Sequence, residues 1–249
     1  MKQLIGIALV LSLFACNKSE PNINSIEEKG QAVDKIEPIQ TKFSFEYGSP
    51  IVIESSDQVM IPLSANSPAK RRKLSGSSYS SYDFPRYWNV VFYDGKTGST
   101  RLLTEKKVRI SNIHVNKAEE YILLDDDTNQ EMSQVILYEI EDIDFNGDGT
   151  LTSKDPTYLF SSSTGGTNLQ RISPHNEHVQ YFEVVPNSDQ LLLRTIRDSN
   201  RDSIFTEKDI SIWYKAELAN QQWKLDEIID VSNRQKIEDL FLNQWFKQD

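Results

Sequence analysis

Residues 136–160, ILYEIEDIDFNGDGTLTSKDPTYLF, place an acidic loop between two apolar runs that are rich in β-branched and aromatic residues. Such runs are typical of β-strands. Residues 191–214, LLLRTIRDSNRDSIFTEKDISIWY, repeat this order of apolar run, acidic loop and apolar run. An internal repeat predicts stacked structural units. Because Pro156 and the apolar run after it favour a strand over a helix, we expect each loop to be a hairpin connection in a β-protein.

The first acidic loop begins at Asp144 and carries oxygen-bearing side chains at alternate positions. Ca²⁺ prefers six to eight oxygen ligands, and alternate side chains of a tightly coiled loop point to one centre. Gly149, at position six, permits the sharp turn because glycine tolerates positive φ. A solvated acidic turn is the alternative, but the register favours a calcium site in which Thr150 supplies its backbone carbonyl. The candidate ligands are Asp144, Asn146, Asp148, Thr150, Thr152 and Asp155.

A second loop, beginning at Asp198, has the same register. Ser203 replaces the glycine at position six, so we expect a strained turn and weaker binding than in the first loop. Ile204 would supply its backbone carbonyl. The candidate ligands are Asp198, Asn200, Asp202, Ile204, Thr206 and Asp209.

The spacing of both loops resembles the calcium loops of EF-hands and dockerins, and Asp155 at position twelve resembles the dockerin variant. Residues 165–198 resemble the blade repeat of TolB-like β-propellers, in which a glycine-rich turn precedes an L-x-x-I-[TS]-P motif and a later P-N-S-D turn. These resemblances imply calcium as a cofactor and a propeller-like fold. The matching residues are Gly165, Gly166, Leu169, Ile172, Ser173, Pro174 and residues 186–189.

Short apolar runs bounded by turn residues recur along the chain and predict an antiparallel all-β architecture, as a sandwich, barrel or propeller. We expect a propeller-like antiparallel repeat domain, closed or incomplete. About four to five blades is the most that the chain can hold, at roughly 45 residues each. The predicted strands lie within 42–47, 50–55, 87–94, 121–126, 134–141, 157–163, 179–185, 190–196 and 210–218.

The C-terminus changes to a helical period. Within 233–246, Ile237, Leu240, Phe241 and Trp245 share one helical face. Ser232 and Gln235 resemble a capping box, which would start the helix. We expect an amphipathic helix packed on the sheet, with docking to a partner as the alternative.

The N-terminal residues 1–15 have the short apolar core of an export signal. Leu13-Phe14-Ala15-Cys16 resembles the lipobox of bacterial lipoproteins, and the whole chain resembles a Bacteroidetes-type lipoprotein. That resemblance implies acylation of Cys16, anchoring in a membrane and a place in the cell envelope, on the periplasmic or surface face of the outer membrane. We expect a flexible tether over 16–41 and the β domain over 42–249. Cys16 is the only cysteine, so the domain would contain no disulfide.

The net charge of −10 argues against a nucleic-acid partner. Neither a G-x-S-x-G elbow nor a phosphate-binding glycine loop is present, and His175 and His178 are expected to be exposed turn histidines. The sequence therefore favours a non-enzymatic, calcium-stabilised binding or assembly module with an unknown protein or glycan partner. The alternatives are a propeller-type polysaccharide hydrolase or lyase and a surface adhesin.

Overall fold

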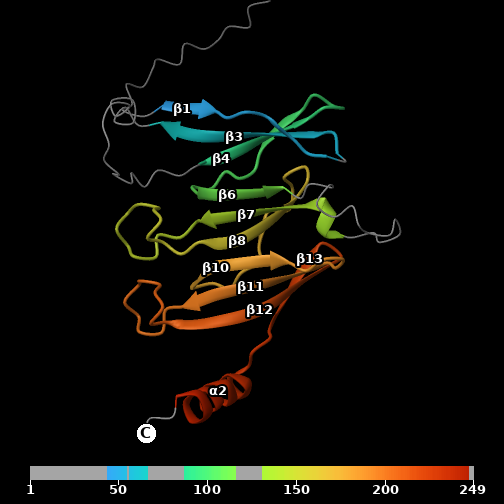
Figure 1. Ribbon diagram of the computed structural model, residues 1–249. Coiled ribbons are helices and arrows are strands. Elements are labelled where there is room, and N and C mark those ends of the chain that lie inside the picture. Colours follow the sequence, from blue (N-terminus) through green and yellow to red (C-terminus); the bar gives the residue numbers. More distant parts are fainter. Residues whose placement is uncertain (1–43, 55, 67–86, 116–130, 247–249) are drawn as a thin grey trace, which may run out of the picture. The chain divides into compact units, whose positions relative to one another are not determined.

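A computed structural model describes residues 44–54, 56–66, 87–115 and 131–246 (Figure 1). All the described residues fall within one compact unit, 42–249. The predicted signal segment, Cys16, the whole tether and the expected strand at 121–126 lie outside the described residues.

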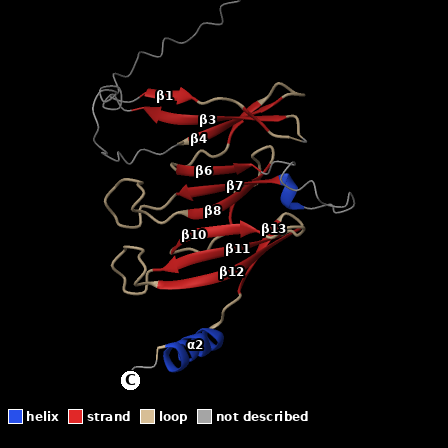
Figure 2. Cartoon of the chain, in the orientation of Figure 1, coloured by secondary structure: helices blue, strands red, loops and turns tan. Residues whose placement is uncertain are grey.

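The described chain forms three antiparallel sheets (Figure 2). The first has the order β1-β3-β4-β5, and β2 also pairs with β3. The expected antiparallel β architecture is thus confirmed, whereas no closed barrel or propeller is present in the described part. The strands of the first sheet are β1 (Ser44–Tyr47), β2 (Ile51–Val52), β3 (Gln58–Asn66), β4 (Asn89–Asp94) and β5 (Thr100–Leu102).

The second and third sheets are four-stranded meanders, in which each strand pairs with the next along the chain. The two acidic loops join β7 to β8 and β11 to β12, which pair antiparallel, so the hairpin prediction is confirmed for both. The second sheet contains β6 (Arg109–Val115), β7 (Val135–Glu141), β8 (Tyr158–Ser163) and β9 (Gln170–Arg171). The third contains β10 (Glu177–Val184), β11 (Gln190–Arg197), β12 (Ile210–Ala219) and β13 (Gln222–Glu227).

The central strands of the second sheet, β7 and β8, are buried on both faces. Tyr138 and Tyr158 belong to a core cluster that includes Phe92 of the first sheet. Leu137 and Leu159, their neighbours in β7 and β8, belong to another cluster with residues of the third sheet. Successive side chains of a strand point to opposite faces, so a strand covered on both faces must be apolar throughout. This requirement explains the apolar runs 136–138 of β7 and 158–160 of β8, whereas the buried hydroxyls of Ser161 and Ser162 in β8 are hydrogen-bonded.

Several strands were not predicted, and their sequences show why. β13 (QWKLDE) alternates exposed and half-buried residues and contains three charged side chains. β6 is interrupted by a bulge between Ile110 and Asn112, which breaks the strict alternation of its side chains. The other unpredicted strands are β3, β5 and β9, whereas the expected strand at 50–55 is reduced to the two residues of β2.

The C-terminal helix exists, but two expectations about it are wrong. Helix α2 (Val231–Leu240) has Asp230 as its N-cap, whose side chain accepts a hydrogen bond from the Asn233 N–H, so Ser232 is not the cap. None of its residues is buried, and Ile237 and Leu240 are exposed. The helix therefore does not pack its apolar face on a sheet. A π-helical turn, η3 (Phe241–Trp245), follows α2. No helix among the described residues is long and apolar enough to cross a membrane.

Candidate metal loops and the clefts beside them

The first acidic loop is ordered by its own carboxylate and amide side chains. The two Asp144 carboxylate oxygens accept hydrogen bonds from the N–H groups of Asp148 (3.1 Å) and Gly149 (2.7 Å). Asn146 Oδ1 accepts from the Asp148 N–H, at 2.9 Å. Asp148 Oδ1 in turn accepts from the N–H of Thr150, at 2.9 Å, and from its hydroxyl. The side chains at positions one, three and five thus hold the loop backbone in a coil by accepting hydrogen bonds from its N–H groups.

Asp155, at position twelve, closes the first loop. Its side chain is buried, and its two oxygens accept hydrogen bonds from the N–H groups of Phe145 (2.9 Å) and Thr152 (2.8 Å). This carboxylate therefore connects the start of the loop to its end. The last ligand of a calcium loop occupies the same position.

The second loop repeats most of this network, but Asp198 Oδ1 accepts from the N–H at position four (Arg201) and not from that at position five. Asp198 accepts from the Ser203 N–H, and Asp202 accepts from the Ile204 N–H. Asp209 accepts from the N–H groups of Ser199 and Thr206, both at 3.0 Å. These donors occupy the same loop positions as Gly149, Thr150, Phe145 and Thr152 of the first loop. The repeat recognised in the sequence is therefore also a repeat of hydrogen bonds.

Both loops have positive φ at positions four and six. In the first loop these positions are Gly147 and Gly149, with φ of 71° and 84°. In the second they are Arg201 and Ser203, with φ of 61° and 62°. A side chain disfavours this backbone region, so the expected strain at Ser203 is confirmed, and Arg201 adds a second strained position that the sequence did not reveal.

The donor set of both loops suits a hard cation. The candidate ligands are carboxylate, amide, hydroxyl and backbone carbonyl oxygens, without nitrogen or sulfur. Hydrogen bonds from Thr150 lower the pKa of Asp148, and the Thr206 N–H lowers the pKa of Asp209, so both carboxylates remain ionised at neutral pH. In the described part of the chain, no three His, Cys, Asp or Glu side chains converge closely enough to form a metal centre by themselves. Ligation would therefore draw on the amide, hydroxyl and carbonyl oxygens as well.

Aromatic rings join the two loops. The Phe145 and Phe205 ring centroids lie 5.2 Å apart, and the His178 ring lies 5.8 Å from that of Phe205. A cleft of about 700 Å³ lies between the loops and is lined by residues of both, including Asp155 and Asp202. The two loops thus form one continuous surface.

His178 is not the exposed turn histidine that the sequence suggested. It lies in β10, is half-buried, and its Nδ1 accepts a hydrogen bond of 3.0 Å from the Thr157 N–H. Burial lowers its pKa below 6.5. His175, by contrast, is exposed as expected, and its Nδ1 lies 2.6 Å from Arg171 Nη1.

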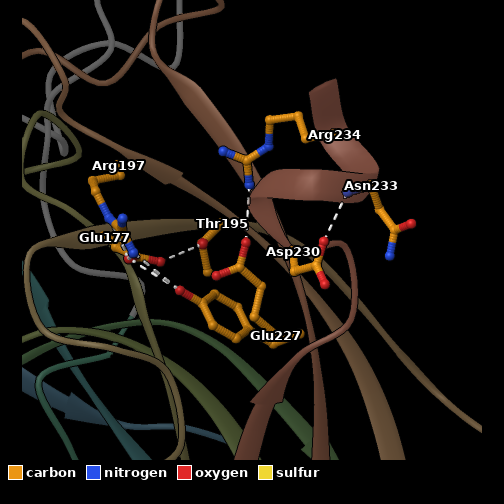
Figure 3. Close-up of polar contacts among 8 residues, drawn as sticks. Glu177, Thr195, Arg197, Glu227, Asp230, Asn233 and Arg234 are labelled. Atoms are coloured by element: carbon orange, nitrogen blue, oxygen red, sulfur yellow. Dashed lines mark hydrogen bonds and ion pairs between the residues drawn. The ribbon is translucent and has the colours of Figure 1, made fainter. Parts of the chain in front are cut away.

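A buried carboxylate that the sequence reading missed lies beside the second loop. Glu177 is 2% exposed and accepts hydrogen bonds from Thr195, Tyr214 and Arg197 (Figure 3). Arg197 donates through both Nε (2.8 Å) and Nη2 (2.6 Å) to Glu177 Oε1. Burial is the main cause that raises the pKa of Tyr214 to about 12, so its hydroxyl stays protonated. Glu177 and Arg197 face each other across β10 and β11, and only the strand register brings them together.

This cluster forms one side of a second cleft, also of about 700 Å³. Loop residues Phe145, Asp198 and Arg201 line the same cleft. Figure 3 further shows Arg234 of α2 donating to Glu227 of β13, which ties the helix to the end of the third sheet.

No protein-family model and no curated protein matches this chain.

Proposed function

We propose that this protein is a lipid-anchored component of the cell envelope whose β domain is stabilised by calcium and serves as a binding or assembly module. The observation that carries the proposal is the hydrogen-bond network that the two acidic loops share. In each loop, side chains at positions one, three, five and twelve accept from backbone N–H groups at equivalent positions. Such ordering reduces the conformational entropy that the loop would otherwise lose when its ligands gather around a cation.

In this proposal a calcium ion would supply charge compensation for the clustered carboxylates of each loop. Asp144, Asp148 and Asp155 would provide the charged ligands of the first site, and Asp198, Asp202 and Asp209 those of the second. The ion would matter for stability because Cys16 is the only cysteine, so no disulfide within the chain can stabilise the domain. A ligand present at a thousandfold excess over its dissociation constant stabilises the folded state by about 4 kcal/mol.

Localisation in the cell envelope is part of the same proposal and rests on the sequence pattern that ends at Cys16. Acyl chains on that residue would hold the protein at a membrane, on the periplasmic or surface face of the outer membrane. The four-stranded meanders would then be blade-like units of an open, TolB-like β-propeller. Their antiparallel order and the turn at Gly166 support this finer description.

The test is calcium titration calorimetry combined with thermal unfolding of the soluble chain lacking residues 1–16. We expect heat of binding, and a chelator should lower the melting temperature by several degrees, since about 1 kcal/mol shifts it by 2–4 °C in a domain of this size. Asp144→Ala should reproduce much of that loss. Glu207→Gln removes one charge from the second loop without touching a candidate ligand and should behave as wild type. Absence of heat at millimolar calcium would contradict the proposal.

A further inference from the structure

The cleft beside the second loop is lined by Arg197, whose guanidinium is held in position by the buried Glu177. Glu177 is almost fully buried and binds the Nε and Nη2 edge of Arg197. Burying a carboxylate costs free energy that an ion pair rarely recovers in full, so stability alone is a weak reason for the pair. The pair does hold a planar guanidinium in one orientation while 51% of the Arg197 side chain remains exposed. A guanidinium fixed in this way is pre-organised to bind an anion.

A second cation lines the same cleft. Arg201 is exposed at position four of the second loop, and among the described residues its side chain forms no ion pair. Its backbone N–H donates to Asp198 Oδ1, at 2.6 Å, which holds this strained turn in place. The cleft therefore presents two guanidinium groups from different elements, one anchored by Glu177 and one carried by the loop.

Besides the two arginines, the lining contains the carboxylates of Glu177 and Asp198, the His175 ring, and apolar and uncharged polar groups. Phe145 and Pro174 provide apolar surface, and Asn176, Ser203 and Tyr214 provide amide and hydroxyl groups. A sugar ring offers a C–H face for an aromatic ring and hydroxyls for such polar groups. The cleft volume of about 700 Å³ lies within the range of small-ligand sites.

We propose that this cleft binds an acidic sugar, with its carboxylate on Arg197 and Arg201 and its ring against Phe145. The proposal deepens the binding function proposed above, because it names the class of ligand. It rests on that proposal in one respect, the effect of calcium. Two arginines and the carboxylates of Glu177 and Asp198 cancel in formal charge, so a cation bound by Asp198 would leave the cleft positive. Calcium should therefore strengthen binding of the acidic sugar.

The test is an NMR titration of the soluble chain with methyl glucuronide, and with methyl glucoside as the matched neutral ligand. We expect the glucuronide to bind at least about tenfold more tightly, as expected for a charge-assisted arginine–carboxylate contact. Arg201→Gln, and Arg197→Lys as a second variant that keeps a cation beside Glu177, should each weaken binding by about tenfold. Arg194→Gln removes an exposed arginine of β11 outside the cleft and should leave binding unchanged.

Equal binding of both sugars, no binding of either, or unchanged binding by both cleft variants would overturn the proposal. Tighter binding of a short acidic peptide would also overturn it, in favour of a protein partner. Calorimetry separates the two proposals. Heat from calcium without glucuronide binding refutes only the sugar site, whereas glucuronide binding without heat from calcium refutes only the metal loops. If calcium binds yet leaves glucuronide affinity unchanged, the charge argument is wrong.

Discussion

Phe145 and Phe205 bring together two loops that are far apart in the sequence. Their ring centroids lie 5.2 Å apart with the ring planes at 50°. Phe145 occupies position two of the first acidic loop, and Phe205 occupies position eight of the second. The Phe145 N–H donates to the closing carboxylate of Asp155, and the Thr206 N–H, next to Phe205, donates to that of Asp209. The ring contact therefore lies between residues that border the two candidate metal sites.

The aromatic contact should be measurable as a coupling free energy. Phe145→Ala and Phe205→Ala should each destabilise the domain, and the double variant should lose less than the sum of the two. An aromatic pair of this geometry is worth about 0.5–1.5 kcal/mol beyond its burial. Denaturant unfolding of the wild type, both single variants and the double variant measures the difference. Strict additivity would show that the rings do not couple the loops.

Replacing Ser203 by glycine should stabilise the second loop and tighten its calcium binding. Ser203 has φ of 62°, a backbone conformation that glycine adopts without a steric penalty. We expect Ser203→Gly to stabilise the domain by roughly 0.5–1 kcal/mol and to tighten calcium binding at this loop. The reciprocal change, Gly149→Ser, should cost a similar amount in the first loop, where φ is 84°. Thermal unfolding and calcium calorimetry measure both effects. If neither substitution changes stability or calcium affinity, the strain argument is wrong.

Acid should destabilise the domain through His178. Burial lowers its pKa below 6.5 in the folded state, so below about pH 6.5 the unfolded chain takes up a proton more readily than the folded one. The free energy of unfolding should therefore fall as the pH is lowered from about 7.5 to about 5.5. His178→Asn keeps an acceptor near the Thr157 N–H but cannot be protonated, so its stability should depend less on pH in this range.

Thermal unfolding at both pH values, in the presence of a chelator, measures this difference without interference from calcium release. His175→Asn is the matched control, since His175 is exposed, and it should keep the pH dependence of the wild type. A parallel loss of stability in wild type and His178→Asn would show that burial of this ring has no such effect.

Gly166 should be intolerant of any side chain. Its φ is 69°, and an added Cβ would lie 2.2 Å from Cε2 of Phe92, which is fully buried. Its carbonyl also accepts a hydrogen bond of 2.6 Å from Arg101. We expect Gly166→Ala to destabilise the domain by about 2–4 kcal/mol. Gly98→Ala tests backbone strain alone, because Gly98 has φ of 70° and open space around it, and should cost about 1 kcal/mol. Equal losses would contradict the proposed clash.

The sequence by itself predicted the features that depend on neighbours along the chain. Oxygen-bearing side chains at alternate positions identified both loops, and a glycine at position six strengthened the first, because each loop hydrogen-bonds within its own residues. The apolar runs on either side of Asp144 and Asp198 predicted their hairpins for the same reason. A helical period predicted α2, since that period belongs to a single segment.

Tertiary structure alone decided which residues meet across strands and sheets. Register places Glu177 opposite Arg197, and no local pattern predicts it because pairing depends on how distant segments align. Burial of β7 and β8 on both faces explains the apolar runs 136–138 and 158–160, whereas His178 is half-buried in β10 of the third sheet. For α2, the helical period could be recognised in the sequence. Whether another part of the molecule would cover Ile237 could not be predicted, because that depends on contacts with other segments.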